Sequence, residues 1–271
     1  MEMEYITHSP DVSLPMDEQH VMAVGFFDGV HLGHQSLLQQ AKAIAKKEGL
    51  KFTVMTFDPH PHEIIKQETD RRYITPLDSK LQRISAFGAD KIFVITFNSS
   101  FASIPADTFI RKYMIGLHAK HVVVGFDFTF GHKAQGDVEY LRQFSKDHSF
   151  EVTVMAKMTQ CNQKISSTLI RNLIRVGDVH LIPHYLGKHY EIRGAFVESS
   201  SQSFRIDPKY VMPKPGLYQV EIQTCGTTTK GLLYCGDESC MVSSRSIVPQ
   251  TGEDITVKFL QRSASKMPVT R

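Results

Sequence analysis

An apolar run passes directly into a pair of histidines in the stretch Val21-Met22-Ala23-Val24-Gly25-Phe26-Phe27-Asp28-Gly29-Val30-His31-Leu32-Gly33-His34. The run predicts a buried strand, and residues 33–47 predict a helix that ends at Gly49. The apolar positions of this helix fall on one face: Leu37, Leu38, Ala41, Ile44 and Ala45. At such a junction two imidazoles and the unpaired amides of the first helical turn converge, so an anion is held from several sides. The stretch therefore predicts a phosphate site, with a nucleotide as the expected ligand.

Two histidines three residues apart also suit a metal ion or a solvated helix edge. Here Gly25 and Gly29 permit a close approach of the backbone, and Gly33 leaves no side chain between the histidines. A zinc site needs a third and usually a fourth ligand, but the four cysteines lie far away without CxxC spacing. Metal binding is therefore the weaker interpretation of His31 and His34.

A second motif lies at Lys164-Ile165-Ser166-Ser167-Thr168-Leu169-Ile170-Arg171, after an alternating run over residues 150–155. Ser166 or Ser167 is a candidate N-cap for the helix that follows. Hydroxyls, free helix amides, Lys164 and Arg171 then face one direction, which suits a triphosphate. The alternative is an ordinary serine-capped helix that carries a surface arginine.

Four segments, in this order along the chain, resemble the adenylyltransferase module of the prokaryotic FAD synthetase family, whose members are bifunctional riboflavin kinases and FMN adenylyltransferases. The resemblance spans roughly residues 18–187 and rests on residues 25–34, 56–61, 123–131 and 165–171. It implies a nucleotidyltransferase that moves AMP from ATP to FMN and so produces FAD and pyrophosphate. Because the FMN phosphate has a second pKa of about 6, the nucleophile is already ionised and no protein base is required.

The order of predicted elements separates the chain into two domains, residues 1–187 and 188–271. In the first, strands alternate with helices, which indicates an α/β fold with a doubly wound parallel sheet, the expected nucleotidyltransferase domain. Its strands are expected at 20–25, 51–57, 91–97, 120–126 and 150–156, and its helices at 33–48, 78–87, 105–117, 137–147 and 167–186. In the second, short β-like runs indicate a small antiparallel barrel or sandwich, at 189–197, 216–223, 229–235, 240–247 and 254–260.

By the resemblance, the second domain corresponds to the riboflavin kinase module, and here the sequence departs from the family pattern. The hallmark segment Gly-x-Pro-Thr-Ala-Asn is absent from the whole sequence. The family's catalytic glutamate is expected within residues 240–245, which contain no acid. We therefore interpret this domain as a degenerate kinase-like barrel, with a bifunctional enzyme as the alternative.

The resemblance also implies roles for individual side chains. His31 and His34 are the candidates for binding the α- and β-phosphates of ATP, and Ser167, Thr168 and Arg171 for the β- and γ-phosphates. Mg²⁺ is implied, held mainly by ATP oxygens and water because the motifs contain no obvious carboxylate cage. Further residues of the two phosphate motifs are expected to bind substrate: Gly25, Phe26, Asp28, Gly33, Lys164 and Ser166.

The flavin requires an apolar slot with a few polar groups, and aromatic residues cluster near the predicted strand ends. Phe128 and Phe130 are candidates for this slot, with plain core packing as the alternative. Asp127 is costly if buried without a partner, so it is expected to face the crevice or a partner. Asp58 and His60 suit a structural turn as well as a substrate contact, and Asn98 is a weaker candidate still.

Composition supports small-molecule partners. The net charge of +3 and the absence of like-charge blocks argue against nucleic-acid or anionic-membrane binding. No apolar stretch is as long as a membrane span requires, and four unpatterned cysteines suit a reducing cytoplasm. The sequence carries no signal for the oligomeric state. A flavin- or nucleotide-binding regulator without turnover is the alternative from another functional class.

Overall fold

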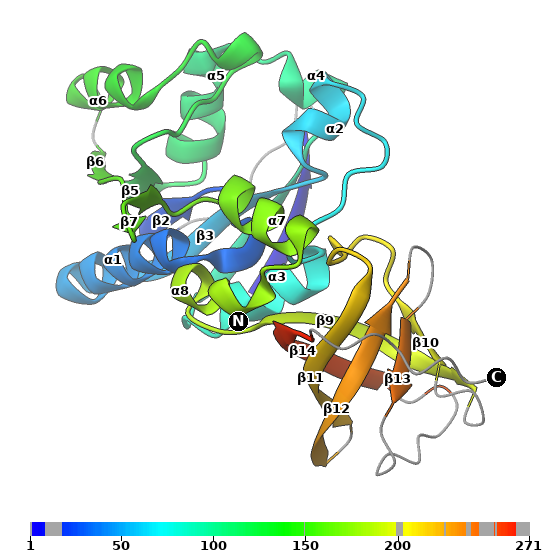
Figure 1. The fold of residues 1–271 in the computed structure, drawn as a ribbon. Helices are drawn as coiled ribbons and strands as arrows, with labels where there is room; N and C mark the ends of the chain where they lie inside the picture. The colour runs from blue at the N-terminus through cyan, green and yellow to red at the C-terminus, as the bar shows by residue number, and fades with distance from the viewer. Residues whose placement is uncertain are drawn as a thin grey trace. The chain divides into compact units, whose positions relative to one another are not determined.

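The computed structural model describes residues 2–8, 18–148, 150–198, 203–224, 226–236, 240–243, 252 and 254–263. The chain divides into two compact units, which Figure 1 shows as ribbons. The first unit comprises Met1–Arg71 and Leu77–Met158, and the second comprises Arg72–Pro76 and Thr159–Arg271. The expected domain boundary after Gly187 stays a prediction, because α-helical segments before this residue belong to the second compact unit.

The first unit is built on a parallel sheet of six strands, so the predicted α/β fold with a parallel sheet is confirmed. Its strands follow in the order β1 (Glu2–Thr7), β4 (Lys91–Thr96), β3 (Lys51–Asp58), β2 (His20–Val24), β5 (Ala119–Gly125) and β6 (Glu151–Met155). Strand β1 was not expected from the sequence. It lies at the edge of the sheet and is mostly exposed, so it lacks the apolar pattern that marks the inner strands.

Strand β2 shows why this sheet is rigid. All five of its residues are buried, and alternate side chains enter two different apolar clusters. Met22 and Val24 pack on one face of the sheet, whereas Val21 and Ala23 pack on the other. A strand buried on both faces holds the residue that follows it in a defined position.

Three helices of the first unit lie close to their predicted positions: α1 (Leu32–Glu48), α3 (Leu77–Ser85) and α6 (Val138–Lys146). The short helices α2 (Pro61–Ile65) and α4 (Ser99–Ala102) and the 3₁₀ turns η1 (Asp28–Val30) and η3 (His132–Ala134) were not expected, and α5 covers Ala106–Ile110. The expected helix over residues 105–117 consists of α5 and a π-helical turn, η2 (Arg111–Ile115). None of the helices among the described residues has the length and apolar character needed to cross a membrane.

The second unit begins with the hairpin β7 (Thr159–Gln160) and β8 (Gln163–Lys164) and then becomes helical. The prediction of a single helix over 167–186 is wrong, since α7 (Ser167–Val176), η4 (Val179–Leu181) and α8 (Pro183–Leu186) are separate. Gly177 ends α7 in the left-handed conformation, at a φ of 89°. A Cβ at this position would lie 2.8 Å from the Tyr218 hydroxyl, so only glycine fits the turn.

Six antiparallel strands then close into a barrel, as the sequence predicted for the C-terminal part. They are β9 (Tyr190–Glu198), β10 (Ser203–Ile206), β11 (Gly216–Thr224), β12 (Thr227–Cys235), β13 (Cys240–Ser243) and β14 (Asp254–Arg262). Strand β10 was not expected. Tyr190, Tyr218 and Phe259 are fully buried, and the Phe259 ring contacts both tyrosine rings at the aromatic centre of the barrel.

Candidate active site

The link between β2 and α1 is a tight turn that brings His31 to the start of the helix. Phe27, Gly29 and Val30 all have positive φ values, of 59°, 82° and 46°. For Phe27 and Val30 this conformation costs roughly 1–3 kcal/mol each, so the surrounding packing must hold the turn in place. His31 is the N-cap of α1, and its Nδ1 accepts a hydrogen bond from the His34 amide at 3.2 Å.

The imidazoles of His31 and His34 stack on each other, with centroids 3.6 Å apart and an interplanar angle of 13°. Gly33 leaves room for the stack, because a Cβ there would lie 3.2 Å from His31 Cε1, a tight contact. His34 Nδ1 is buried and has no hydrogen-bond partner among the residues that the structure describes. Burial, together with repulsion from His31 and Lys80, holds the pKa of His34 well below its usual value. At neutral pH His34 is therefore a neutral imidazole with an unused ring nitrogen.

Lys80 of α3 is a buried cation that the sequence analysis missed. Its Nζ donates a hydrogen bond to the Phe57 carbonyl at 3.0 Å and lies 4.2 Å from the centre of the Phe26 ring. Burial lowers the pKa of Lys80 to about 8, against the opposing attraction of Asp28 and Asp58. The sequence offers one signal for this burial: Lys80 stands four residues before Ile84, so both side chains lie on the buried face of α3.

Asp58 is the last residue of β3, and His60 lies two residues further on, where it caps the helix α2. Its Nδ1 accepts from the His62 amide at 3.0 Å, and its own amide donates to Glu63 Oε1 at 3.2 Å. These two bonds form the capping box of α2. The ring of His60 also meets the Phe26 ring edge-on, at 4.4 Å between centroids. His60 therefore supports the β2–α1 turn through Phe26.

Asn98 and the aromatic residues around it have structural contacts too. The Asn98 side chain is the N-cap of α4, with Oδ1 accepting from the Phe101 amide at 2.8 Å. Phe57, Phe97 and Phe101 are buried in a single apolar cluster. These contacts favour the core-packing interpretation for the three phenylalanines.

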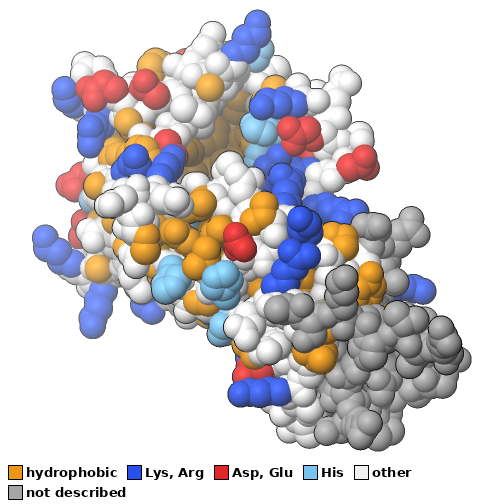
Figure 2. Space-filling view, viewed as in Figure 1, with side chains coloured by type: hydrophobic (Ala, Val, Ile, Leu, Met, Phe, Trp, Pro, Cys, Tyr) orange, Lys and Arg blue, Asp and Glu red, His pale blue; other side chains and the backbone are white. Residues whose placement is uncertain are grey.

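The loop after β5 presents a different set of side chains. Asp127 is exposed and Phe128 is half-buried, whereas Phe130 is buried. The rings of Phe128 and Phe130 stack at 5.4 Å. Figure 2 shows a hollow with hydrophobic side chains inside it, in the region of the first unit where Figure 1 has α2 and α4 to one side and α5 to the other. Phe128 and Asp127 thus offer an apolar face and a carboxylate to a ligand.

In the second unit, the start of α7 has the capping geometry that the sequence predicted. Ser166 is the N-cap, and its Oγ accepts from the Leu169 amide at 3.2 Å. Thr168 is exposed, and Lys164 lies in β8. Arg171 is buried, and its Nη1 donates to the Arg72 carbonyl at 2.9 Å. Arg171 is therefore not the surface arginine of the alternative interpretation.

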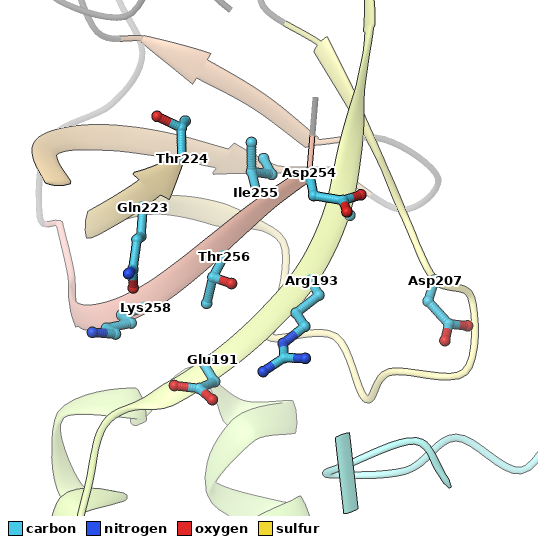
Figure 3. Close-up of a pocket in the computed structure, with 10 residues that line it drawn as sticks. Glu191, Arg193, Asp207, Gln223, Thr224, Asp254, Ile255, Thr256 and Lys258 are labelled. Atoms are coloured by element: carbon cyan, nitrogen blue, oxygen red, sulfur yellow. The ribbon is translucent and has the colours of Figure 1, made fainter. Parts of the chain in front are cut away.

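The barrel holds a pocket of about 830 Å³ lined by residues of β9, β11 and β14. Its wall carries both signs of charge, as Figure 3 shows for Glu191 and Arg193 on β9 and for Lys258 on β14. Asp207 and Asp254 add two further carboxylates to the lining. The acids of this pocket come from outside residues 240–245, the segment in which the family resemblance places the catalytic glutamate.

In this α/β unit, an inner strand of the parallel sheet leads into a pair of imidazoles at the N-terminus of a helix. This arrangement is typical of nucleotide-binding proteins. The model of the FAD synthetase family matches residues 14–169. This chain belongs to the FAD synthetase family, and the expected family and the enzyme class, a nucleotidyltransferase, are confirmed.

Relatives resemble the chain over most of its length. The bifunctional riboflavin kinase/FMN adenylyltransferase of Listeria monocytogenes is 35% identical over 87% of this chain and 78% of its own. The enzyme of the same name from Bacillus subtilis is 34% identical over 92% of this chain and 82% of its own. A second Listeria monocytogenes protein, named FAD synthetase, is 32% identical over 87% of this chain and 94% of its own.

A solved structure extends the likeness to the whole chain. The crystal structure titled macrolide-efflux protein, from Streptococcus pneumoniae, superposes with a TM-score of 0.86 at 26% identity. The match covers 100% of this chain and 94% of that protein. The α/β unit and the barrel are therefore both part of the shared fold.

Proposed function

We propose that this protein is an FMN adenylyltransferase, which transfers AMP from ATP to FMN and releases FAD and pyrophosphate. The observation that carries the proposal is the stacked pair His31 and His34 at the start of α1, in a chain of the FAD synthetase family. ATP and FMN are the small-molecule partners that this reaction requires. Gly25, Phe26, Asp28 and Gly33, which lie in the same stretch of chain as the pair, are proposed to bind substrate with it.

In the proposed reaction an oxygen of the FMN phosphate attacks the α-phosphorus of ATP. The new O–P bond forms while the bond from the α-phosphorus to the bridging oxygen breaks, and pyrophosphate leaves with the electron pair. Because the attacking phosphate is already ionised, the protein's part is positioning and charge stabilisation. His31 and His34 are proposed to donate hydrogen bonds to the α- and β-phosphates, with the Lys80 cation strengthening the local positive potential.

Ser167, Thr168 and Arg171 are proposed to bind the β- and γ-phosphates, assisted by Lys164 and the Ser166-capped helix start. Phe128 and Phe130 are proposed to contact the flavin, with Asp127 on its polar edge. Asp58 is the last residue of β3, and His60 and Asn98 follow the strands β3 and β4. The proposed part of these three residues is to hold the loops around the substrates, and the capping contacts of His60 and Asn98 support this assignment.

Mg²⁺ is proposed to enter with ATP, held mainly by phosphate oxygens and water. Over the described part of the chain, the one group of three side chains spaced to hold a metal ion is Glu48, His121 and Glu151, which is not part of either phosphate motif. Asp28 and Asp58 lie close enough to Lys80 to attract its charge. The charge of Lys80 therefore already compensates these two acids in part, without a metal ion. When bound, Mg²⁺ neutralises charge on the phosphates as pyrophosphate departs.

We further propose that the barrel does not phosphorylate riboflavin, although several relatives are named bifunctional. Riboflavin offers a neutral hydroxyl, so its phosphorylation requires an activating group and a metal held against ATP. The Gly-x-Pro-Thr-Ala-Asn segment is missing, and residues 240–245 contain no acid. The pocket of Figure 3 has carboxylates, but they stand beside Arg193 and Lys258 in a lining of mixed charge.

One experiment with two arms tests both proposals. The purified chain is incubated with ATP and Mg²⁺ and with either FMN or riboflavin, and FAD, FMN and pyrophosphate are quantified. We expect FAD and equimolar pyrophosphate from FMN, and no FMN from riboflavin. Absence of FAD in the first arm would favour a binding protein without turnover. Steady formation of FMN in the second arm that is lost in a parallel preparation of Asp254→Asn, a change in the barrel pocket, would establish a bifunctional enzyme.

Replacing Arg171 with lysine tests its proposed contact with the triphosphate. Lysine keeps the charge but loses the planar fork of donors, so a bidentate phosphate contact weakens. We expect kcat/KM for ATP to fall by on the order of tenfold, which corresponds to about 1.4 kcal/mol. The matched control is Arg175→Lys, an exposed arginine one turn further along α7. Equal kinetics for the two variants would remove Arg171 from the ATP site, and a thermal melt separates this effect from loss of the bond to Arg72.

A further inference from the structure

Three side chains with metal-binding atoms meet where β5 and β6 begin. His121 is the third residue of β5, Glu151 is the first residue of β6, and the two are register partners in the sheet. Glu48 is the last residue of α1. His121 Nδ1 lies 3.4 Å from Glu48 Oε1 and 3.4 Å from Glu151 Oε2. One ligand atom from each residue falls within 4.8 Å of the others.

The imidazole of His121 is held in a way that points its Nδ1 into this cluster. Only 8% of the side chain is exposed, and Nδ1 has no hydrogen-bond partner within the described ranges. On the other side of the ring, Nε2 lies 2.8 Å from Thr153 Oγ1. When Nε2–H donates to this hydroxyl, Nδ1 carries the free lone pair. Metal-binding histidines are commonly oriented by such a second hydrogen bond.

The distances suit a shared ion better than direct hydrogen bonds. An N–H···O hydrogen bond spans about 2.7–3.2 Å, and both contacts of Nδ1 are longer. Around a tetrahedral Zn²⁺, with bonds of about 2.0–2.2 Å, neighbouring ligand atoms are separated by roughly 3.3–3.5 Å. The distances from His121 Nδ1 to Glu48 Oε1 and to Glu151 Oε2, both 3.4 Å, agree with this separation between neighbouring ligand atoms. The C-terminal end of α1, where Glu48 lies, adds a partial negative charge that favours a cation.

We propose that Glu48, His121 and Glu151 form a binding site for a divalent transition metal of the Zn²⁺ type, with water as the fourth ligand. An imidazole with two carboxylates favours such an ion over Mg²⁺ or Ca²⁺, which prefer six or more oxygen ligands. His121 and Glu151 lie near the amino ends of their parallel strands, whereas the phosphate motif follows the carboxyl end of β2. The ion therefore links the edge strand β6 to β5 and α1, away from the proposed reaction.

Binding of Zn²⁺ itself tests the site. The full-length protein is freed of metal with a chelator and dialysed, and Zn²⁺ is titrated by calorimetry. Co²⁺ serves as a second probe, because its visible absorption reports tetrahedral geometry. The exposed Glu151→Gln removes one ligand without opening a cavity, and Glu48→Gln/Glu151→Gln removes both carboxylates. The exposed His180→Gln, outside the cluster, is the control.

We expect one Zn²⁺ per chain in the native protein and in the control, and affinity at least 10- to 100-fold lower in Glu151→Gln. The double variant is expected to lose the Co²⁺ absorption band and the rise in melting temperature that Zn²⁺ causes, while FAD formation stays at the native rate. If the native chain binds no Zn²⁺, or if the double variant binds it as tightly as the native protein, the site does not exist.

Discussion

Replacing His34 with alanine is expected to lower kcat for FAD formation by on the order of 10²-fold or more. The neutral imidazole of His34 stacks on His31 at the start of α1 and has one ring N–H, which is proposed to donate a hydrogen bond to a phosphate. Loss of one strong donor to a developing negative charge costs about 2.7–4 kcal/mol in the transition state. Because this donor acts as charge moves onto the phosphates, the loss is expected in kcat more than in KM for ATP.

His31 requires a different substitution, since its Nδ1 also caps α1. His31→Asn keeps an acceptor for the His34 amide and removes the ring, so activity falls on the same scale while the helix stays capped. The matched control is His118→Asn. His118 is exposed and has a φ of 63°, which asparagine tolerates. Native turnover in both His31→Asn and His34→Ala would refute the assignment of the pair to the phosphates.

Lys80→Met is expected to lower kcat by at least tenfold at pH 7 and to change how stability depends on pH. Burial disfavours the charged form of Lys80, so the native protein bears a free-energy cost for holding a cation there. Ionisable groups held in unfavourable environments are concentrated at functional sites. The expected loss of activity follows because the variant removes the cation that lies beside Phe26 and the carbonyl of Phe57. The exposed Lys46→Met, on α1, is the control.

The sign of the pH effect follows from the two pKa values of Lys80. Its pKa is about 8 in the folded protein against 10.5 when unfolded. Between these values the unfolded chain binds more protons, so the free energy of unfolding rises with pH relative to that of Lys80→Met. The difference is expected to grow by up to about 3 kcal/mol from pH 8 to pH 10.5, measured by urea denaturation. A difference that stays constant over this range would show that Lys80 titrates as an exposed lysine.

Much of the fold can be read from local sequence patterns. The strand residues 21–24 are apolar throughout because both faces of β2 are buried, and the helix after them has a clear apolar face. Capping residues are equally local, so the sequence narrowed the N-cap of α7 to Ser166 or Ser167, and the structure has Ser166 there. The family was predicted from the four segments 25–34, 56–61, 123–131 and 165–171, which are also local patterns in the sequence. The apolar pattern fails where exposure removes it, as in β1.

Tertiary structure decided which of these residues meet. Lys80 lies 23 positions after Phe57 in the chain but donates to its carbonyl, and Arg171 is bonded to the Arg72 carbonyl 99 positions earlier. His121 faces Glu48 only because α1 ends where β5 begins. Periodicity and capping depend on residues a few positions apart, so a sequence displays them directly. Burial, pKa shifts and ligand clusters depend on distances set by the packing of whole elements, and these arise only when the chain is folded.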